Sequence, residues 1–131
     1  MTFKNNNIPW VEAEMSVNGD IKIPVSAYID LASSEAIEML IREDAKFNLS
    51  DDLEDYYLGR GFSGDINKLI IGPYVLENVK ASFADAKIRS KQNNADGVLG
   101  IGSLRRFNLI FDYKNRKLYL KPNSHFNESF N

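Results

Sequence analysis

The sequence has 131 residues, of which 44% are hydrophobic and 26% charged, values typical of one globular domain. A net charge of -2 excludes the strongly basic surface that polyanion binding needs, so nucleic acid is not an expected partner. The absence of cysteine excludes disulfides and thiolate chemistry, and a single histidine excludes a His-rich metal site. No apolar run approaches the roughly 20 residues that a membrane span requires, so no span is expected.

The first thirty residues predict a β-hairpin. Apolar residues occupy alternate positions from Val11 to Val17 and again from Ile21 to Ile29, with Asn18-Gly19 between the two runs. Alternation with a period of two is typical of half-buried strands, and Asn and Gly both tolerate the positive φ angles of a tight turn. Pro24 has no N–H to donate, so the second strand should leave an edge at that point.

The middle of the chain is less regular. Residues 33–49 fit either a helix or a strand end followed by a short helix near residues 42–47. The acidic stretch at residues 51–55 is interpreted as a solvated loop rather than a metal site, because no further ligands can be identified.

A glycine-rich segment follows, Gly59-Arg60-Gly61-Phe62-Ser63-Gly64, and it is interpreted as the tip of a hairpin. It is not a phosphate-binding loop, because no lysine follows at the required spacing. Apolar residues 69–71 and 75–76 flank Gly72-Pro73 and predict a second hairpin, which the alternating residues 79–83 extend.

The last third predicts a short apolar strand at Val98-Leu99 and a helical turn that Ser103 caps and that runs through Phe107. A third hairpin should follow, with a four-residue loop at 114–117. In that register Tyr113 faces Leu118 and Phe111 faces Leu120. The polar residues 123–131, with His125 as an exposed loop residue, are interpreted as a tail or linker. Many short strands at regular spacing indicate a closed or sandwiched all-β domain.

Two short motifs suggest a function through their order along the chain. Tyr28-Ile29-Asp30-Leu31-Ala32-Ser33 is an apolar strand that delivers an aspartate into a turn of small residues, and Val98-Leu99-Gly100 is an apolar strand that enters a glycine turn. The glycine-rich hairpin lies between them. This order resembles the retropepsin-like aspartic peptidases, with their hydrophobic-hydrophobic-Asp-x-Gly motif, flap hairpin and hydrophobic-hydrophobic-Gly motif. The stretch ADGVLGIGSLRRFNLIFDYKNRKLYLKP is similar to the C-terminal part of bacterial domains in that family.

The resemblance implies one all-β, barrel-like lobe at residues 10–122, with a hairpin flap and one or two short helices, an N-terminal tail at 1–9 and a linker at 123–131. It implies tandem lobes, of which this chain is the second, with a PDZ domain after it, or a homodimer. It also favours an exported or cell-envelope location. No metal or organic cofactor is implied.

The resemblance assigns residue roles as well. Asp30 matches the catalytic aspartate, and a second carboxylate must come from a partner lobe, because two such groups share one proton around a water molecule. The segment Gly59–Gly64 matches the flap that closes over an extended peptide substrate. Gly97 and Gly100 match the structural glycine turn. Asp30 and the glycine after Leu99 should therefore end neighbouring strands that cross beneath a single groove.

The sequence departs from the family pattern in the supporting turn of the aspartate, which comprises Leu31, Ala32 and Ser33. Leu31 stands where threonine is usual and Ala32 where glycine is usual. These departures leave an alternative open, in which the lobe is catalytically inert and binds peptides or scaffolds an active partner. Two other readings also remain, an Asp30 that merely caps its turn and a small β-domain dimer unrelated to peptidases.

Overall fold

The computed structural model describes residues 2–4, 8–16, 22–41, 63–85 and 95–130. Four of the features expected from the sequence lie outside these ranges: the Asn18-Gly19 turn, the short helix near 42–47, the acidic stretch at 51–55, and the flap residues Gly59–Phe62.

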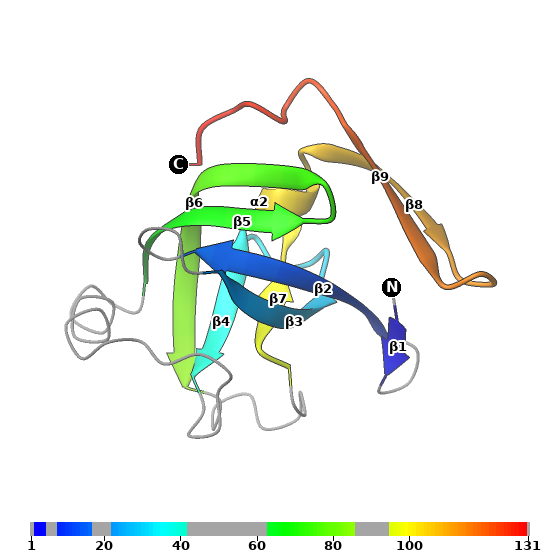
Figure 1. The fold of residues 1–131 in the computed structure, drawn as a ribbon, viewed down its shortest axis with the longest axis horizontal. Coiled ribbons are helices and arrows are strands. Elements are labelled where there is room, and N and C mark those ends of the chain that lie inside the picture. Colours follow the sequence, from blue (N-terminus) through cyan, green and yellow to red (C-terminus); the bar gives the residue numbers. More distant parts are fainter. Residues whose placement is uncertain (1, 5–7, 17–21, 42–62, 86–94, 131) are drawn as a thin grey trace.

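The described residues are almost entirely β-structure, as the sequence indicates (Figure 1). One sheet has the strand order β1-β2-β3-β7-β4-β6-β5, and an additional pairing of β2 with β5 closes six of its strands into a barrel. A separate hairpin pairs β8 with β9. The elements are β1 (Thr2–Lys4), β2 (Ile8–Ser16), β3 (Ile23–Ile29), β4 (Ile37–Ile41), β5 (Ser63–Ile71), β6 (Tyr74–Asp85), β7 (Gly97–Leu99), α2 (Ile101–Leu104), β8 (Phe107–Asp112) and β9 (Lys117–Pro122).

The first two predicted hairpins are confirmed. β2 and β3 pair antiparallel from Trp10 opposite Tyr28 to Met15 opposite Ile23, and β5 and β6 pair antiparallel around the two-residue loop Gly72-Pro73. Gly72 has a φ of 58°, a left-handed conformation that glycine adopts without steric cost. The segment at 33–49 proves to contain a strand, β4, which pairs parallel with β6 and antiparallel with β7.

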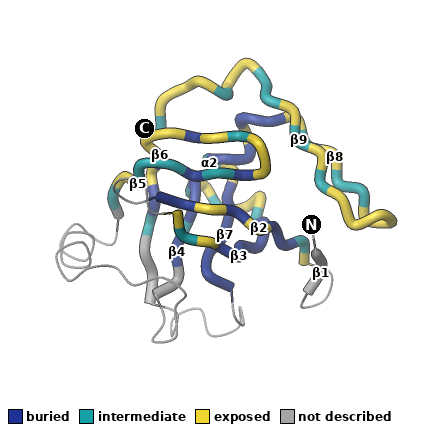
Figure 2. The backbone as a smooth tube through the Cα atoms, in the orientation of Figure 1, coloured by how far each residue is buried: buried dark blue, intermediate teal, exposed yellow. Residues whose placement is uncertain are grey.

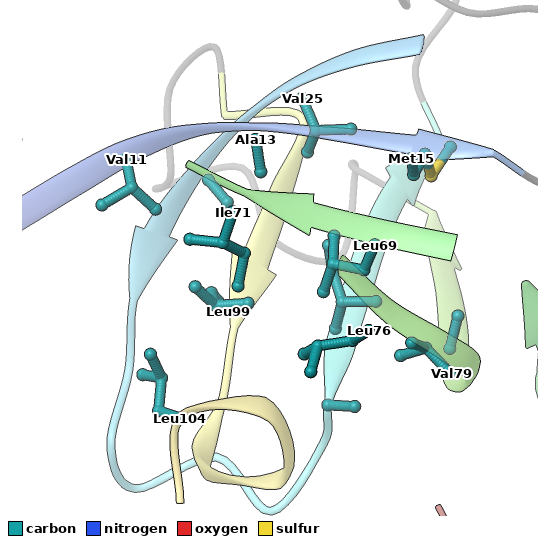
Figure 3. Packing of buried hydrophobic residues seen from close by; sticks show 14 of the residues in the cluster. Val11, Ala13, Met15, Val25, Leu69, Ile71, Leu76, Val79, Leu99 and Leu104 are labelled. Atoms are coloured by element: carbon teal, nitrogen blue, oxygen red, sulfur yellow. The ribbon is translucent and has the colours of Figure 1, made fainter. Parts of the chain in front are cut away.

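Buried residues are concentrated on the barrel strands (Figure 2), and their side chains fill the barrel interior (Figure 3). In β2, Val11, Ala13 and Met15 are buried while Glu12 and Glu14 are exposed, which is the predicted alternation. A buried aliphatic side chain contributes about 1.5–3 kcal/mol, so this cluster is the main source of stability. Its largest fully buried aliphatic members are Met15, Ile37, Met39, Ile66, Leu69, Leu99 and Leu104.

A second, smaller cluster lies on the other face of β3. Trp10, Tyr28, Ala95 and Val98 are all buried there, and the Trp10 and Tyr28 ring centroids are 6.1 Å apart. Because both faces of β3 are covered, its residues from Val25 to Ile29 are buried without alternation.

The helical turn differs from the prediction. α2 covers Ile101–Leu104, begins after Gly100 and has no side-chain cap, whereas Phe107 already belongs to β8. Ser103 is therefore not the cap. It lies inside the turn, fully buried, and its Oγ donates a hydrogen bond to the Ala36 carbonyl 2.9 Å away. A serine hydroxyl can either cap a helix or bond a distant carbonyl, and here the contact with Ala36 is the one formed.

The register of the third hairpin also differs. Phe111 faces Leu118 and Leu109 faces Leu120, a shift of two residues from the expected pairing. The cause lies in the loop: Asp112 accepts hydrogen bonds from the backbone and side-chain amides of Asn115, and Arg116 adopts a φ of 54°. Because side chains alternate with a period of two, this shift leaves the same residues on each face.

The C-terminal segment 123–130, interpreted from the sequence as a tail or linker, folds back over the barrel (Figure 1). Arg106, which is 2% exposed, holds this segment in place. Its guanidinium donates hydrogen bonds to the backbone carbonyls of residues 125, 126, 128 and 129. The same group lies 3.6 Å from the centroid of the Phe130 ring. Phe126 packs edge-on against Phe107 and Tyr74. Burial, together with the charge of Arg105, lowers the pKa of Arg106 below its usual range.

Within the described residues, no helix has the length and apolar character needed to cross a membrane.

Replacing Arg106 should release the C-terminal segment. We expect Arg106→Ala to lower the free energy of unfolding by about 2–4 kcal/mol, because several backbone carbonyls lose their shared donor at once. Arg106→Lys should lose most of the same energy, since an ammonium group lacks the planar fork. Urea denaturation measures both variants. The matched control is Arg105→Ala, an exposed neighbour that pairs with Glu128. An equal loss in that control would contradict the role given to Arg106.

Candidate functional site

Asp30 follows the last residue of β3 and lies beside the end of β7. The two strands run parallel, with Tyr28 opposite Val98 and Ile29 opposite Leu99. The Asp30 amide then donates a hydrogen bond to the Leu99 carbonyl, 3.0 Å away. The expectation that the aspartate and the glycine after Leu99 end neighbouring strands is therefore confirmed, whereas the single groove expected over these strand ends stays a prediction.

The supporting turn is compact. The Asp30 carboxylate accepts a hydrogen bond from the Ala32 amide at 3.0 Å, and the Ser33 amide donates to the Asp30 carbonyl at 3.1 Å. These bonds orient the carboxyl group, which is partly buried, at the end of the barrel. They fit both a catalytic aspartate whose geometry is fixed and an aspartate that caps its own turn.

The turn is joined to the glycine motif by several backbone hydrogen bonds. The amides of Ile101 and Gly102 donate to the carbonyls of Ser33 and Glu35, at 2.8 and 3.0 Å. The Gly100 amide reaches the Ala36 carbonyl at 3.3 Å, and the Ser103 hydroxyl donates to the same oxygen. Sequence reasoning missed the residues 35–36 and 102–103, because their contacts join positions more than sixty residues apart and leave no local pattern.

The glycines are required for close approach. A Cβ on Gly100 would lie 2.2 Å from the Glu35 carbonyl oxygen, and one on Gly97 would lie 2.8 Å from the Glu38 carbonyl oxygen. Neither glycine has a positive φ; Gly100 is extended, with a φ of -102°. Both glycines make room for a crossing backbone, a reason beyond the turn geometry expected from the sequence.

Asp96 extends the pairing of β3 with β7. It is 1% exposed, its amide donates to the Ser26 carbonyl, and its carboxylate accepts from the Ser26 amide, both at 2.8 Å. The Asp96 carboxylate thus accepts a hydrogen bond from β3 that a backbone carbonyl would accept in a regular strand pair.

Two apolar side chains are exposed on the loops at Asp30. Leu31 is 50% exposed and Ile101 is 36% exposed, and they come from the two loops that the Ile101–Ser33 hydrogen bond joins. Two cavities of about 440 and 500 Å³ occur elsewhere, and neither is lined by Asp30. Of the expected flap, Ser63 and Gly64 are described; they begin β5 and pair with Ser82 and Ala81 of β6.

Comparison with known proteins gave no match to a family model, a curated protein sequence or a solved structure.

A side chain at Gly100 should push the two loops apart. We expect Gly100→Ala to lower the free energy of unfolding by about 3 kcal/mol, because the added Cβ meets fixed backbone atoms rather than a flexible side chain. The comparison is Gly72→Ala, where nothing lies within 4 Å of the new Cβ and only the left-handed φ costs energy, about 1 kcal/mol. Urea denaturation of both variants measures the difference. Equal losses would show that no close approach exists at Gly100.

Proposed function

We propose that the chain is one lobe of a retropepsin-like aspartic peptidase and that Asp30 supplies one of two catalytic carboxylates. The observation that carries the proposal is the position of Asp30 at the end of β3, tied to the end of the parallel strand β7 just before Gly100. This is where the sequence resemblance requires the aspartate, and the closed all-β barrel is the required fold class.

The proposed chemistry needs two carboxyl groups in contact, one charged and one protonated. The charged group takes a proton from a water molecule, whose oxygen attacks the scissile carbonyl carbon, while the protonated group hydrogen-bonds the carbonyl oxygen. Collapse of the tetrahedral intermediate breaks the C–N bond and a proton passes to the leaving amine. The Ala32 amide would hold one Asp30 oxygen in place, which leaves the other oxygen for the water.

A single lobe has one such aspartate, so a partner must complete the site. The half-exposed Leu31 and the partly exposed Ile101 beside Asp30 support a partner at this end of the barrel, because apolar side chains at a surface gain stability when a second surface covers them. Either a homodimer or a second lobe of a longer chain would supply the other carboxylate. The substrate would be an extended peptide.

One observation favours a second candidate, an inert lobe that binds peptides or scaffolds an active partner. Leu31 carries no hydroxyl to tie the two active-site loops together, and its side chain is half exposed. Ala32 keeps the amide that donates to Asp30 but adds a Cβ beside the carboxylate.

Substitution of Asp30 separates the two candidates. If a homodimer supplies the second carboxylate, the purified chain should cleave a quenched fluorescent peptide library with a rate that rises faster than linearly with protein concentration, because the active species has two lobes. Asp30→Asn should lower that rate at least 100-fold while the protein stays folded, since an amide cannot act as the base. Glu77→Gln, which removes an exposed carboxylate from β6, is the matched control.

The double variant Leu31→Thr, Ala32→Gly tests the departures from the family pattern and should raise the cleavage rate. If Asp30→Asn cleaves as fast as the unsubstituted chain, Asp30 is not catalytic and the peptidase proposal fails. A chain that binds the same peptides without cleaving them, with or without the double substitution, is the result expected of the inert lobe.

A further inference from the structure

An apolar groove lies away from Asp30, between the β8–β9 hairpin and the barrel. It measures about 440 Å³, within the range of ligand sites, and its walls are β9, the start of β2 and the loop between β5 and β6. We call it the β9 groove. Its lining residues used below are Trp10, Val11, Glu12, Leu118, Tyr119 and Leu120.

One wall of the β9 groove is an open strand edge. Residues 106 and 123 stand opposite each other in the β8–β9 register, and the Asn123 amide donates to the Arg106 carbonyl. In an antiparallel pair, hydrogen-bonded and non-hydrogen-bonded positions alternate. Tyr119 and Lys121 therefore bond to β8, while the N–H and C=O groups of Leu118 and Leu120 point outward. The Tyr74 hydroxyl donates to the Leu120 carbonyl, which confirms that this oxygen points away from β8.

The facing wall is also an open edge. β2 pairs with β3 along one side from Trp10 to Met15. Its other side pairs with β1 up to Trp10 and with β5 only from Glu14 onward. Among the described strands, none pairs with that side at residues 11–13. Ser26 bonds to Asp96 on the side of β3 away from β2, so by alternation Val11 and Ala13 bond to β3 and Glu12 turns its N–H and C=O toward the groove. Two strand edges therefore line one groove. Such edges bind added strands through main-chain hydrogen bonds.

The side chains on β9 indicate what kind of peptide strand would fit the β9 groove. Tyr119 is 50% exposed, and its cross-strand neighbour Ile110 is 65% exposed, so an apolar contact is left for an occupant. Lys117 and Lys121 flank Tyr119 on the same face. The hairpin 107–122 holds four basic residues and one acidic residue, in a chain where acidic residues outnumber basic ones, 18 to 16.

We propose that the β9 groove is a second peptide-binding site, which takes an extended segment of another protein with alternating apolar residues and acidic residues placed opposite Lys117 and Lys121. The segment would add to β9 as a strand, with main-chain hydrogen bonds to Leu118 and Leu120. Opposite charges directly across a strand pair are stabilising, and like charges are destabilising. A second copy pairing through β9 would place Lys117 against Lys121, so it is the poorer occupant.

This site does not depend on the peptidase proposal, because Asp30 does not line the β9 groove. The two can be tested separately: Asp30→Asn should leave binding at β9 unchanged, and substitutions in β9 should leave the Asp30 turn intact.

Binding can be measured with a synthetic peptide of core Glu-Val-Thr-Val-Glu, capped at both ends. Trp10 is the single tryptophan of the chain and lines the groove, so its fluorescence should report the titration. We expect saturable binding, and at least tenfold weaker binding of an isomer with core Val-Val-Thr-Glu-Glu and of the Lys-Val-Thr-Val-Lys peptide. Bound peptide should slow hydrogen exchange at the amides of Leu118 and Leu120, which exchange faster than those of Tyr119 and Lys121 in the free protein.

Two variants test the strand-addition geometry. Leu120→Pro removes an outward N–H and leaves the β8 ladder complete, so the protein should stay folded and bind at least tenfold more weakly. Lys117→Glu combined with Lys121→Glu should reverse the preference between the acidic and basic peptides. Lys22→Glu, the same charge change at an exposed position ahead of β3, is the matched control and should not alter binding.

The proposal is overturned if the acidic peptide fails to bind at 1 mM, if the three peptides bind equally, or if Leu120→Pro binds as well as the unsubstituted chain. It is also overturned by a concentration-dependent dimer that Leu120→Pro abolishes, since that result assigns the β9 groove to a second copy.

Discussion

The structure depends on the close approach of two backbones at Gly100. There the chain leaving β7 passes the loop between β3 and β4 so tightly that a Cβ would lie 2.2 Å from the Glu35 carbonyl oxygen. This contact allows the amides of Gly100, Ile101 and Gly102 to reach carbonyls of residues 33–36. Because buried backbone groups must be paired, the missing side chain is what lets both loops satisfy their hydrogen bonds at one end of the barrel.

The same contact places Asp30. Its amide continues the pairing of β3 with β7, and its carboxylate is oriented by the amide of Ala32. The position of the acid is thus set by main-chain hydrogen bonds rather than by neighbouring side chains, so it tolerates variation in the turn, including leucine at position 31. The fold fixes where the carboxyl group lies. The proposed peptide hydrolysis would also need a second carboxylate, which the fold of one lobe does not supply.

The C-terminal part of the chain is stabilised by different interactions. The segment 123–130 is held largely by one buried guanidinium, which satisfies several carbonyls at once and stacks on Phe130. The β8–β9 hairpin, by contrast, pairs with no described strand of the barrel and has intermediate or exposed residues along most of its length (Figures 1 and 2). Its contact with the barrel core is made by Leu109, Phe111, Leu118 and Leu120. Charged edge strands usually resist unwanted pairing, and the lysines of β9 limit which strands can join it.

The sequence by itself determined the strands, because alternation and turn residues are local signals: the β2–β3 and β5–β6 hairpins, and the apolar strand before Gly100, are where the pattern predicts them. It also determined that Asp30 and Gly100 end neighbouring strands, through a resemblance of order and spacing. Only the tertiary structure decided that β4 is a strand, that Ser103 bonds Ala36 instead of capping a helix, that the β8–β9 register shifts by two, and that Arg106 binds the C-terminal segment. These features rest on contacts between residues distant in the chain, and the energy of such contacts has no signature in a local pattern.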